Sequence, residues 1–232
     1  MVSRRKFIEK TMLAGLSAVV APQLLNAKER LLPQQQPVQP KENGDTSRYL
    51  VKKDNGLRIT GTFLDEISHD IPHQNWGEKE WEQDFRYMKA IGIDTVIVIR
   101  AGYRKFITYP SPYLLKKGCY MPSVDLIDMF LRLADKYGMK FYFGLYDSGH
   151  YWDTGDMSQE LEDNKYVIEE AWKLYGKHKS FKGWYISTEI SRQTKGAINT
   201  FHTMGKQCKD VSGGLSVFIS PWIDGKSCAG NG

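Results

Sequence analysis

The sequence predicts an α/β protein built on a parallel β-sheet, and two features indicate this. The first is a series of short apolar, β-prone runs, of which residues 93–99 (Ile-Asp-Thr-Val-Ile-Val-Ile) form the clearest. Such near-continuous β-branched stretches are typical of parallel strands covered on both faces. The second is a segment with helical spacing between successive runs, long enough for a crossover connection. Strands that alternate with helices in this way favour a parallel sheet.

Five strand–helix steps follow one another from residue 57. We expect strands at 57–64, 93–99, 139–145, 182–188 and 215–219, and helices at 78–91, 122–137, 158–177 and 194–209. Gly92 and Gly138 follow the first two helices, where a terminating glycine is common. Pro122 and Ser123 are expected to open the second helix. The segment 104–121, with its prolines, glycine and tyrosines, is expected to be a loop at the rim of the sheet.

The N-terminal residues read as an export signal followed by a tether. Residues 3–10 (Ser-Arg-Arg-Lys-Phe-Ile-Glu-Lys) precede a short apolar run, and they resemble the twin-arginine signal, with cleavage after Ala27. The other interpretation is an N-terminal amphipathic helix. Residues 28–55 are rich in Pro and Gln and predict a disordered linker, because they offer little apolar surface to bury. We therefore expect an exported bacterial protein, periplasmic or extracellular, that uses the twin-arginine export machinery and does not insert in the membrane when mature.

Charge and cysteine content exclude several functions. Much of the net charge of +5 comes from the leader, and residues 28–232 carry 28 basic and 26 acidic side chains. That balance gives no electrostatic reason to expect nucleic-acid binding. Cys119, Cys208 and Cys228 are far apart in the sequence, so no structural zinc site is expected and at most one disulfide is possible. The sequence also contains no motif for a nucleotide cofactor.

Polar side chains follow the predicted strands, at the point where each strand ends. Because the C-terminal ends of parallel strands share one rim, where ligands bind in α/β proteins, these residues are expected to lie together. Glu189, which follows the aromatic run 181–186, is the main candidate for catalysis or ligand contact. The candidate ligand-binding residues are Glu66, Arg100, Asp147, His150, Tyr151, Trp152 and Trp222. Trp184 and Tyr185 lie inside the strand and are expected in the core.

Five segments of the chain resemble one bacterial family, the domain of unknown function family 4434, whose members are regarded as secreted TIM-barrel glycoside hydrolases. These segments are ITGTF (59–63), the helix and strand between Trp81 and Val96, ADKYGMK (134–140), FGLY (143–146) and FKGWYI (181–186). The resemblance covers residues 57–222. More distantly, Glu189 is similar in position to the acid/base of the clan A glycoside hydrolases, where Asn-Glu usually stands instead of Thr188-Glu189.

Two architectures fit the strand–helix steps. A closed barrel usually needs about 250 residues, and only about 175 lie beyond the linker. An open sheet of about five strands is one explanation, and a (β/α)8 TIM barrel cut short after about five β/α units is the other. The resemblance favours the partial barrel, over residues 56–232, and implies that the second catalytic carboxylate lies beyond this chain.

We therefore expect a glycoside hydrolase with Glu189 as general acid/base. We expect this chain to be an incomplete part of the enzyme, and we expect no cofactor. One alternative is a carbohydrate-binding barrel without catalysis, since the chain is rich in aromatic residues that can stack on sugar rings. A second alternative is a metal-dependent hydrolase that uses His69, Asp70 and His73, although the irregular segment around Pro72 argues against a metal site.

Overall fold

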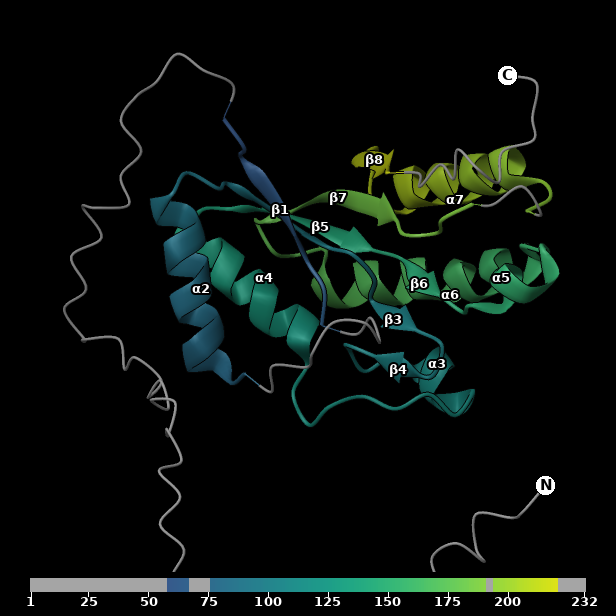
Figure 1. Ribbon diagram of the computed structural model, residues 1–232, viewed down its shortest axis with the longest axis horizontal. Coiled ribbons are helices and arrows are strands. Elements are labelled where there is room, and N and C mark those ends of the chain that lie inside the picture. Colours follow the sequence, from purple (N-terminus) through teal and green to yellow (C-terminus); the bar gives the residue numbers. More distant parts are fainter. Residues whose placement is uncertain (1–57, 67–75, 191–193, 221–232) are drawn as a thin grey trace, which may run out of the picture. The chain divides into compact units, whose positions relative to one another are not determined.

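The computed structural model describes residues 58–66, 76–190 and 194–220, all within the compact unit Asp45–Gly232 (Figure 1). The expected export signal (1–27) and linker (28–55) lie outside the described residues, as does Trp222. In the described part of the chain, no helix is both long and apolar enough to cross a membrane.

A parallel five-stranded sheet forms the centre of this unit and confirms the predicted α/β class. Its strands, in spatial order, are β1 (Gly61–Leu64), β2 (Thr95–Val98), β5 (Lys140–Gly144), β7 (Phe181–Ile186) and β8 (Ser216–Ile219). Every neighbouring pair is parallel. Spatial order follows chain order, so each crossover steps in the same direction. Because crossovers of this kind are right-handed, the connecting helices are all placed on one face of the sheet.

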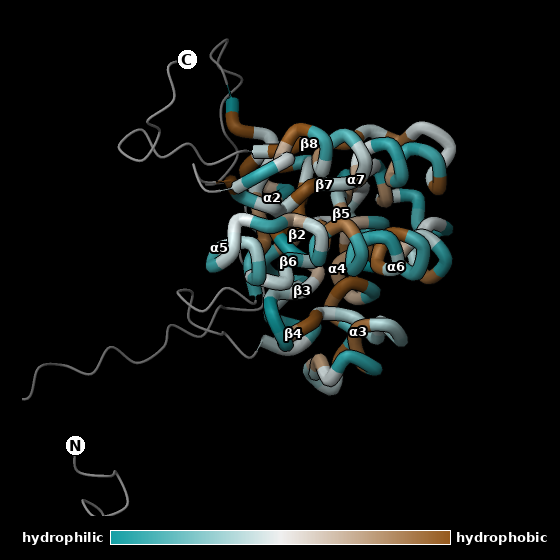
Figure 2. Tube along the Cα trace, turned by 90° about the vertical axis from the view of Figure 1, so that its right-hand side faces the viewer, coloured by the Kyte–Doolittle hydropathy of each residue, from teal (hydrophilic) through white to brown (hydrophobic). Residues whose placement is uncertain are grey.

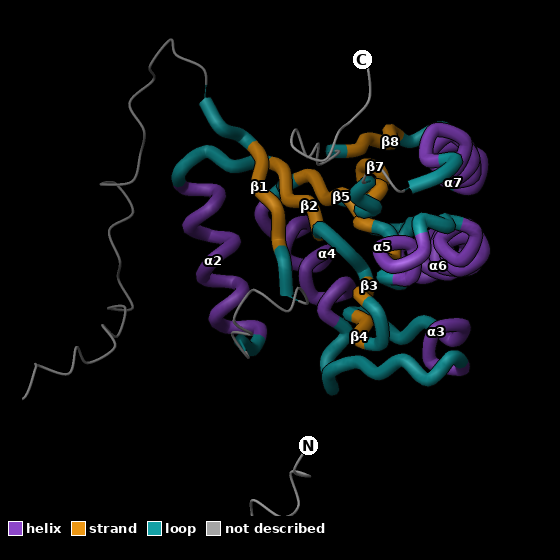
Figure 3. The backbone as a smooth tube through the Cα atoms, turned by 45° about the vertical axis from the view of Figure 1, so that its right-hand side comes forward, coloured by secondary structure: helices purple, strands orange, loops and turns teal. Residues whose placement is uncertain are grey.

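Four long helices make these connections, as can be followed in Figure 3. They are α2 (Glu78–Ala90), α4 (Leu126–Tyr137), α6 (Ser158–Tyr175) and α7 (Ala197–Val211). The start predicted for α4 is wrong, because the helix begins at Leu126 and not at Pro122. Asp125 is its N-cap, and the Asp125 side chain accepts a hydrogen bond from the backbone N–H of Asp128 at 2.9 Å. Gly138 ends α4 in the left-handed conformation, as predicted.

The main core lies between the sheet and these helices. Alternate strand residues point to the helical side, where Phe143 and Trp184 are fully buried and their rings pack edge to face at 5.7 Å. Trp172 of α6 and Phe181 complete this aromatic layer. In Figure 2 brown residues are clear at β8, while α6 and α7 alternate between teal and brown. Trp184 is therefore a core residue, as expected.

The opposite face of the sheet is concave. The rings of Phe63 on β1 and Tyr185 on β7 lie 5.2 Å apart, although two strands separate them. In a flat sheet, strands three places apart would be about 14 Å from each other. Tyr142 and Phe218 line the same face, and their rings are 4.9 Å apart. An added Cβ at Gly144 would lie 2.1 Å from the carbonyl oxygen of Val98, so only glycine allows this close approach of the strands.

Two predicted loops contain regular structure. The segment 104–121, expected to be a rim loop, includes β4 (Phe106–Ile107) and α3 (Pro112–Lys116). A small second sheet joins β4, β3 (Gly102–Tyr103) and β6 (Tyr146–Asp147), and it contributes fully buried side chains such as Ile107. The loop expected after residue 147 contains α5 (His150–Thr154). These elements are only two to five residues long, too short to show a periodicity in the sequence.

Candidate functional site

Glu189 lies just beyond β7, at the C-terminal end of the sheet. The strand ends at Ile186, and Ser187 and Thr188 continue it as buried residues, with 2% and 3% of their surface exposed. The Glu189 side chain, in contrast, is one third exposed. The change from a buried strand to a partly exposed carboxylate therefore occurs at this residue.

Arg100, which follows β2, links two carboxylates from different parts of the chain. Its Nη2 lies 3.8 Å from Oε1 of Glu189, and its Nε lies 3.7 Å from Oδ2 of Asp147. The Arg100 side chain is only 12% exposed, and its guanidinium carbon lies 5.0 Å from the ring centre of Tyr103. Among the described residues, Arg100 Nε has no hydrogen-bond partner. That nitrogen is buried beside Asp147, so the two side chains form an ion pair without a hydrogen bond.

Asp147 is the buried member of this group. Its side chain is completely inaccessible, Oδ1 accepts the backbone N–H of Gly149 at 2.8 Å, and Oδ2 accepts the hydroxyl of Tyr151 at 3.3 Å. Burial raises the pKa of the Asp147 carboxyl, and the Arg100 guanidinium partly opposes this shift. In this structure Asp147 contacts Arg100 and α5 and does not reach the surface.

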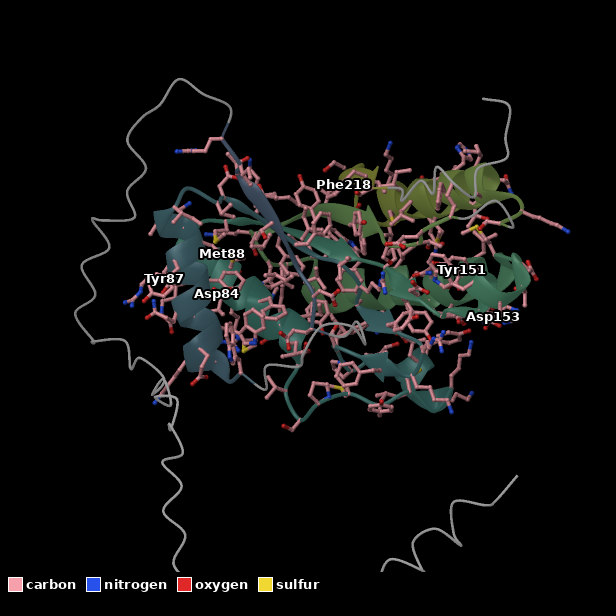
Figure 4. The ribbon with its side chains drawn as sticks, viewed as in Figure 1. Asp84, Tyr87, Met88, Tyr151, Asp153 and Phe218 are labelled. Atoms are coloured by element: carbon pink, nitrogen blue, oxygen red, sulfur yellow. The ribbon has the colours of Figure 1, made fainter. Side chains whose placement is uncertain are left out.

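Tyr151, a candidate ligand-binding residue, is buried and lies between the two carboxylates. It is 1% exposed, on the short helix α5 (Figure 4), and its hydroxyl also accepts the backbone N–H of Glu189 at 3.2 Å. Neighbouring Trp152 is half-buried, with its ring 5.1 Å from that of Tyr151, and His150 is exposed. The structure thus brings Arg100, Asp147, Tyr151 and Glu189 together, with His150 and Trp152 beside them on α5.

Glu160 of α6 belongs to the same region and was not predicted. It is fully buried, and its carboxylate accepts the backbone N–H of Ser148 at 3.1 Å and the Ser148 hydroxyl. Burial raises the pKa of Glu160 to about 7, against the effect of these hydrogen bonds. The sequence does contain a signal for its burial, because Glu160, Asn164, Val167 and Ala171 recur at intervals of three and four along one helix face.

The remaining predicted residues lie elsewhere. Glu66 follows β1 at the same end of the sheet and lines a separate pocket of about 300 Å³. His69, Asp70 and His73 fall outside the described residues, as Trp222 does. Within the described ranges, no group of three or more His, Cys, Asp or Glu side chains could hold a metal ion. Cys119 and Cys208 are free thiols.

These observations define an α/β protein with a cluster of ionisable residues at the C-terminal end of a parallel sheet. The family model DUF4434, a domain of unknown function, matches residues 59–231. The chain belongs to this family, as its sequence segments indicated.

Two solved structures are similar to this chain. One is described as a "putative alpha-L-fucosidase" from Bacteroides thetaiotaomicron VPI-5482. It has 80% sequence identity to this chain and a TM-score of 0.71. The match covers 76% of this chain and 56% of that chain. This chain therefore spans about half the length of that protein. The other is a family 39 glycoside hydrolase from Bacteroides cellulosilyticus WH2, with 12% identity, a TM-score of 0.46, and coverage of 68% and 30%. No protein with a curated description matches.

Proposed function

We propose that this chain carries the acid/base side of a glycoside hydrolase site, with Glu189 as the general acid/base. The observation that carries this proposal is the position of Glu189, a partly exposed carboxylate at the C-terminal end of β7. Its backbone is held by the buried hydroxyl of Tyr151 and its side chain by Arg100. A carboxylate in such fixed surroundings can meet a substrate oxygen at hydrogen-bond distance, as proton transfer requires.

In the proposed reaction, Glu189 donates its proton to the glycosidic oxygen as the bond from that oxygen to the sugar carbon breaks. A second carboxylate then either attacks the sugar carbon or activates the attacking water. Asp147 does not suit that task, because it is fully buried and both its oxygens already have partners. We assign Asp147 a positioning role, in which it holds Arg100 and Tyr151 beside Glu189. The second carboxylate is expected from outside the described residues.

The proposed substrate is a carbohydrate, and α-L-fucosides are the first to test. The support is the 80% identity to the solved chain described as a putative alpha-L-fucosidase. We further propose that the sheet is part of a (β/α)8 TIM barrel. Sequential strand order and the contact between Phe63 and Tyr185 across two intervening strands support such a closure. Export by the twin-arginine machinery to the periplasm or the cell exterior is likewise a proposal, and it depends on residues 1–27 alone.

The test compares the full chain with Glu189→Gln, which keeps the shape of the side chain but cannot transfer a proton. We expect the substitution to lower kcat on a fucosylated oligosaccharide, whose leaving group needs a proton, by about 10²–10⁴-fold, the usual contribution of a general acid. The Kd for fucose, measured by calorimetry, should change little. An unchanged kcat in the variant would remove Glu189 from the mechanism.

A carbohydrate-binding protein without catalysis is the second candidate. It is favoured by the partly exposed aromatic side chains Phe63, Tyr142 and Phe218 on the concave face, because flat apolar rings stack well on sugars, whereas Tyr185 is buried, as expected. For such a protein, both the original chain and Glu189→Gln would bind sugar with similar affinity and neither would hydrolyse any aryl glycoside.

A further inference from the structure

A second pocket lies at the end of β1, away from the contacts of Glu189. Its volume is about 300 Å³, near the lower limit for small-molecule sites. It is lined by Glu66, Trp76, Gly77, Phe106, Pro122, Ser123, Val124 and Leu126. These residues come from the end of β1, the starts of α2 and α4, and β4. The pocket is thus built by four elements that meet at the C-terminal end of the sheet.

The lining combines the groups that recognise a sugar ring. Trp76 is 37% exposed, and its ring is supported from behind by an edge-to-face contact with buried Trp81 at 5.1 Å. A fixed, exposed indole offers a flat apolar face to the C–H side of a pyranose. Glu66 and Ser123 line the same pocket, and a carboxylate and a hydroxyl are groups that can form hydrogen bonds with sugar hydroxyls.

Glu66 of this pocket and Glu189 follow strands that end at the same edge of the sheet. Phe63 and Tyr185 are in ring contact across the concave face, at 5.2 Å. Glu66 lies three residues beyond Phe63, and Glu189 lies four residues beyond Tyr185. The backbones of Glu66 and Glu189 can therefore be at most about 11 Å from the Cα atom of Phe63 and about 14 Å from that of Tyr185, respectively. Both carboxylates leave parallel strands at the same end, within the reach of one short oligosaccharide.

We propose that this pocket, the Trp76 pocket, is a distal subsite that binds one sugar unit of an oligosaccharide whose scissile bond lies at Glu189. The inference deepens the proposed function and rests on it for the position of the scissile bond. If the subsite binds a second sugar unit, the substrate is an oligosaccharide and not a single sugar attached to an arbitrary group. The Trp76 ring would stack on the distal sugar, and Glu66 would accept hydrogen bonds from its hydroxyls.

The test separates oligosaccharide binding from catalysis by using Glu189→Gln as the background. Two proteins, the Glu189→Gln variant and the double variant Glu189→Gln/Trp76→Ala, are applied to an array of immobilised oligosaccharides that includes fucosylated members. We expect Trp76→Ala to weaken binding of oligosaccharides about tenfold, and Trp76→Tyr, which keeps an aromatic ring, to restore most of it. The matched control is Tyr87→Ala, farther along α2 (Figure 4). It should leave binding unchanged.

The outcomes distinguish this inference from the proposed function. Unchanged oligosaccharide binding by Trp76→Ala, or no glycan bound by the background protein, would overturn the subsite. If Trp76→Ala loses binding while Glu189→Gln hydrolyses substrate as fast as the original chain, the subsite stands and the role of Glu189 fails. In chains that keep Glu189, Trp76→Ala should lower kcat/KM on an oligosaccharide about tenfold and leave it unchanged on 4-nitrophenyl α-L-fucoside.

Discussion

Arg100 is the residue through which the two carboxylates of the candidate site interact. It carries one positive charge, nearly buried, beside the buried Asp147 and the partly exposed Glu189. A buried ion is tolerated when it is paired, and removal of one partner leaves an uncompensated charge. The side chains of Arg100 and Asp147 therefore depend on each other, and their contact fixes the end of β2 against the start of α5.

The hydroxyl of Tyr151 is expected to position Glu189. Tyr151→Phe keeps the buried ring and removes only the group that accepts the Glu189 N–H and donates to Asp147. A neutral hydrogen bond contributes about 1 kcal/mol, so we expect kcat to fall about five- to tenfold with little change in KM. Steady-state kinetics on the substrate of the Glu189 test would measure this.

Tyr175→Phe is the matched control for Tyr151→Phe. It also removes a tyrosine hydroxyl bonded to an aspartate, Asp125 at 2.7 Å, but this contact lies at α4. Both variants should lose a similar amount of stability, and only Tyr151→Phe should lose kcat. Equal losses of kcat in the two would show that Tyr151 acts through stability alone.

Glu160 is expected to make the stability of the protein fall as pH rises. Its pKa is raised from 4.5 to about 7 in the folded state, so the folded protein holds an extra proton between these values. Stability therefore decreases as pH rises through this window and levels off above about pH 7. The effect is at most on the order of 3 kcal/mol. Glu160→Gln stays neutral and should lose this part of the pH dependence in thermal unfolding at pH 5, 6, 7 and 8.

The control for Glu160→Gln is Glu169→Gln, an exposed position on the same helix. It should keep the pH dependence of the original chain. Identical slopes for the original chain and Glu160→Gln would contradict a titrating Glu160. Asp147 also has a raised pKa from burial and contributes in the same direction, but it is present in all three proteins and does not affect the comparison.

At the level of single residues, the sequence could predict which side chains lie at the rim of the sheet, but not which side chains contact one another. Glu189, Arg100 and Asp147 each follow a strand, and parallel strands bring such residues to one rim. The burial of Tyr151 could not be predicted, because it depends on two hydrogen bonds of its hydroxyl, one to Asp147 and one from the backbone N–H of Glu189. Asp147 is close in the sequence, but Glu189 is distant from Tyr151, and local patterns carry no information about that second contact.

Among the elements, α4 has a start that is fixed by an N-cap side chain. The Asp125 side chain caps the helix through Asp128 N–H and also accepts the Tyr175 hydroxyl. Asp125→Ala removes both bonds, and we expect it to lower the unfolding free energy by about 2 kcal/mol. Ser123→Ala, at the exposed position predicted to open the helix, should change it by less than about 0.5 kcal/mol. Urea unfolding measures the free energy of unfolding of both variants. A larger loss for Ser123→Ala than for Asp125→Ala would contradict Asp125 as the N-cap.

The long elements were predictable, and the short ones were not. Helix α2 has Trp81, Phe85 and Met88 on its buried face, at the spacing that identified it. In contrast, β3, β4 and β6 have two residues each and exist because Gly102 pairs with both Ile107 and Tyr146. An added Cβ at Gly102 would lie 2.7 Å from side-chain atoms of both partners. Such tertiary pairing leaves no periodic signal in the sequence.

For the whole unit, the parallel strand order was predictable from the alternation of strands and helices, but the curvature was not. The contact between Phe63 and Tyr185 joins residues more than a hundred positions apart. Alternating patterns show which residues share a face, and they contain no measure of how far the sheet bends. The bend brings the rings of Phe63 on β1 and Tyr185 on β7 into contact, and the proposed subsite at the end of β1 depends on it.

The most direct test of Glu189 as the general acid compares two leaving groups. A phenol with a low pKa, such as 2,4-dinitrophenol, leaves without a proton, whereas a sugar alcohol needs one. We expect Glu189→Gln to lower kcat by more than about 10²-fold on a fucosylated oligosaccharide and by much less for cleavage of 2,4-dinitrophenyl α-L-fucoside. An equal loss on both substrates, or no loss on either, would contradict proton donation by Glu189.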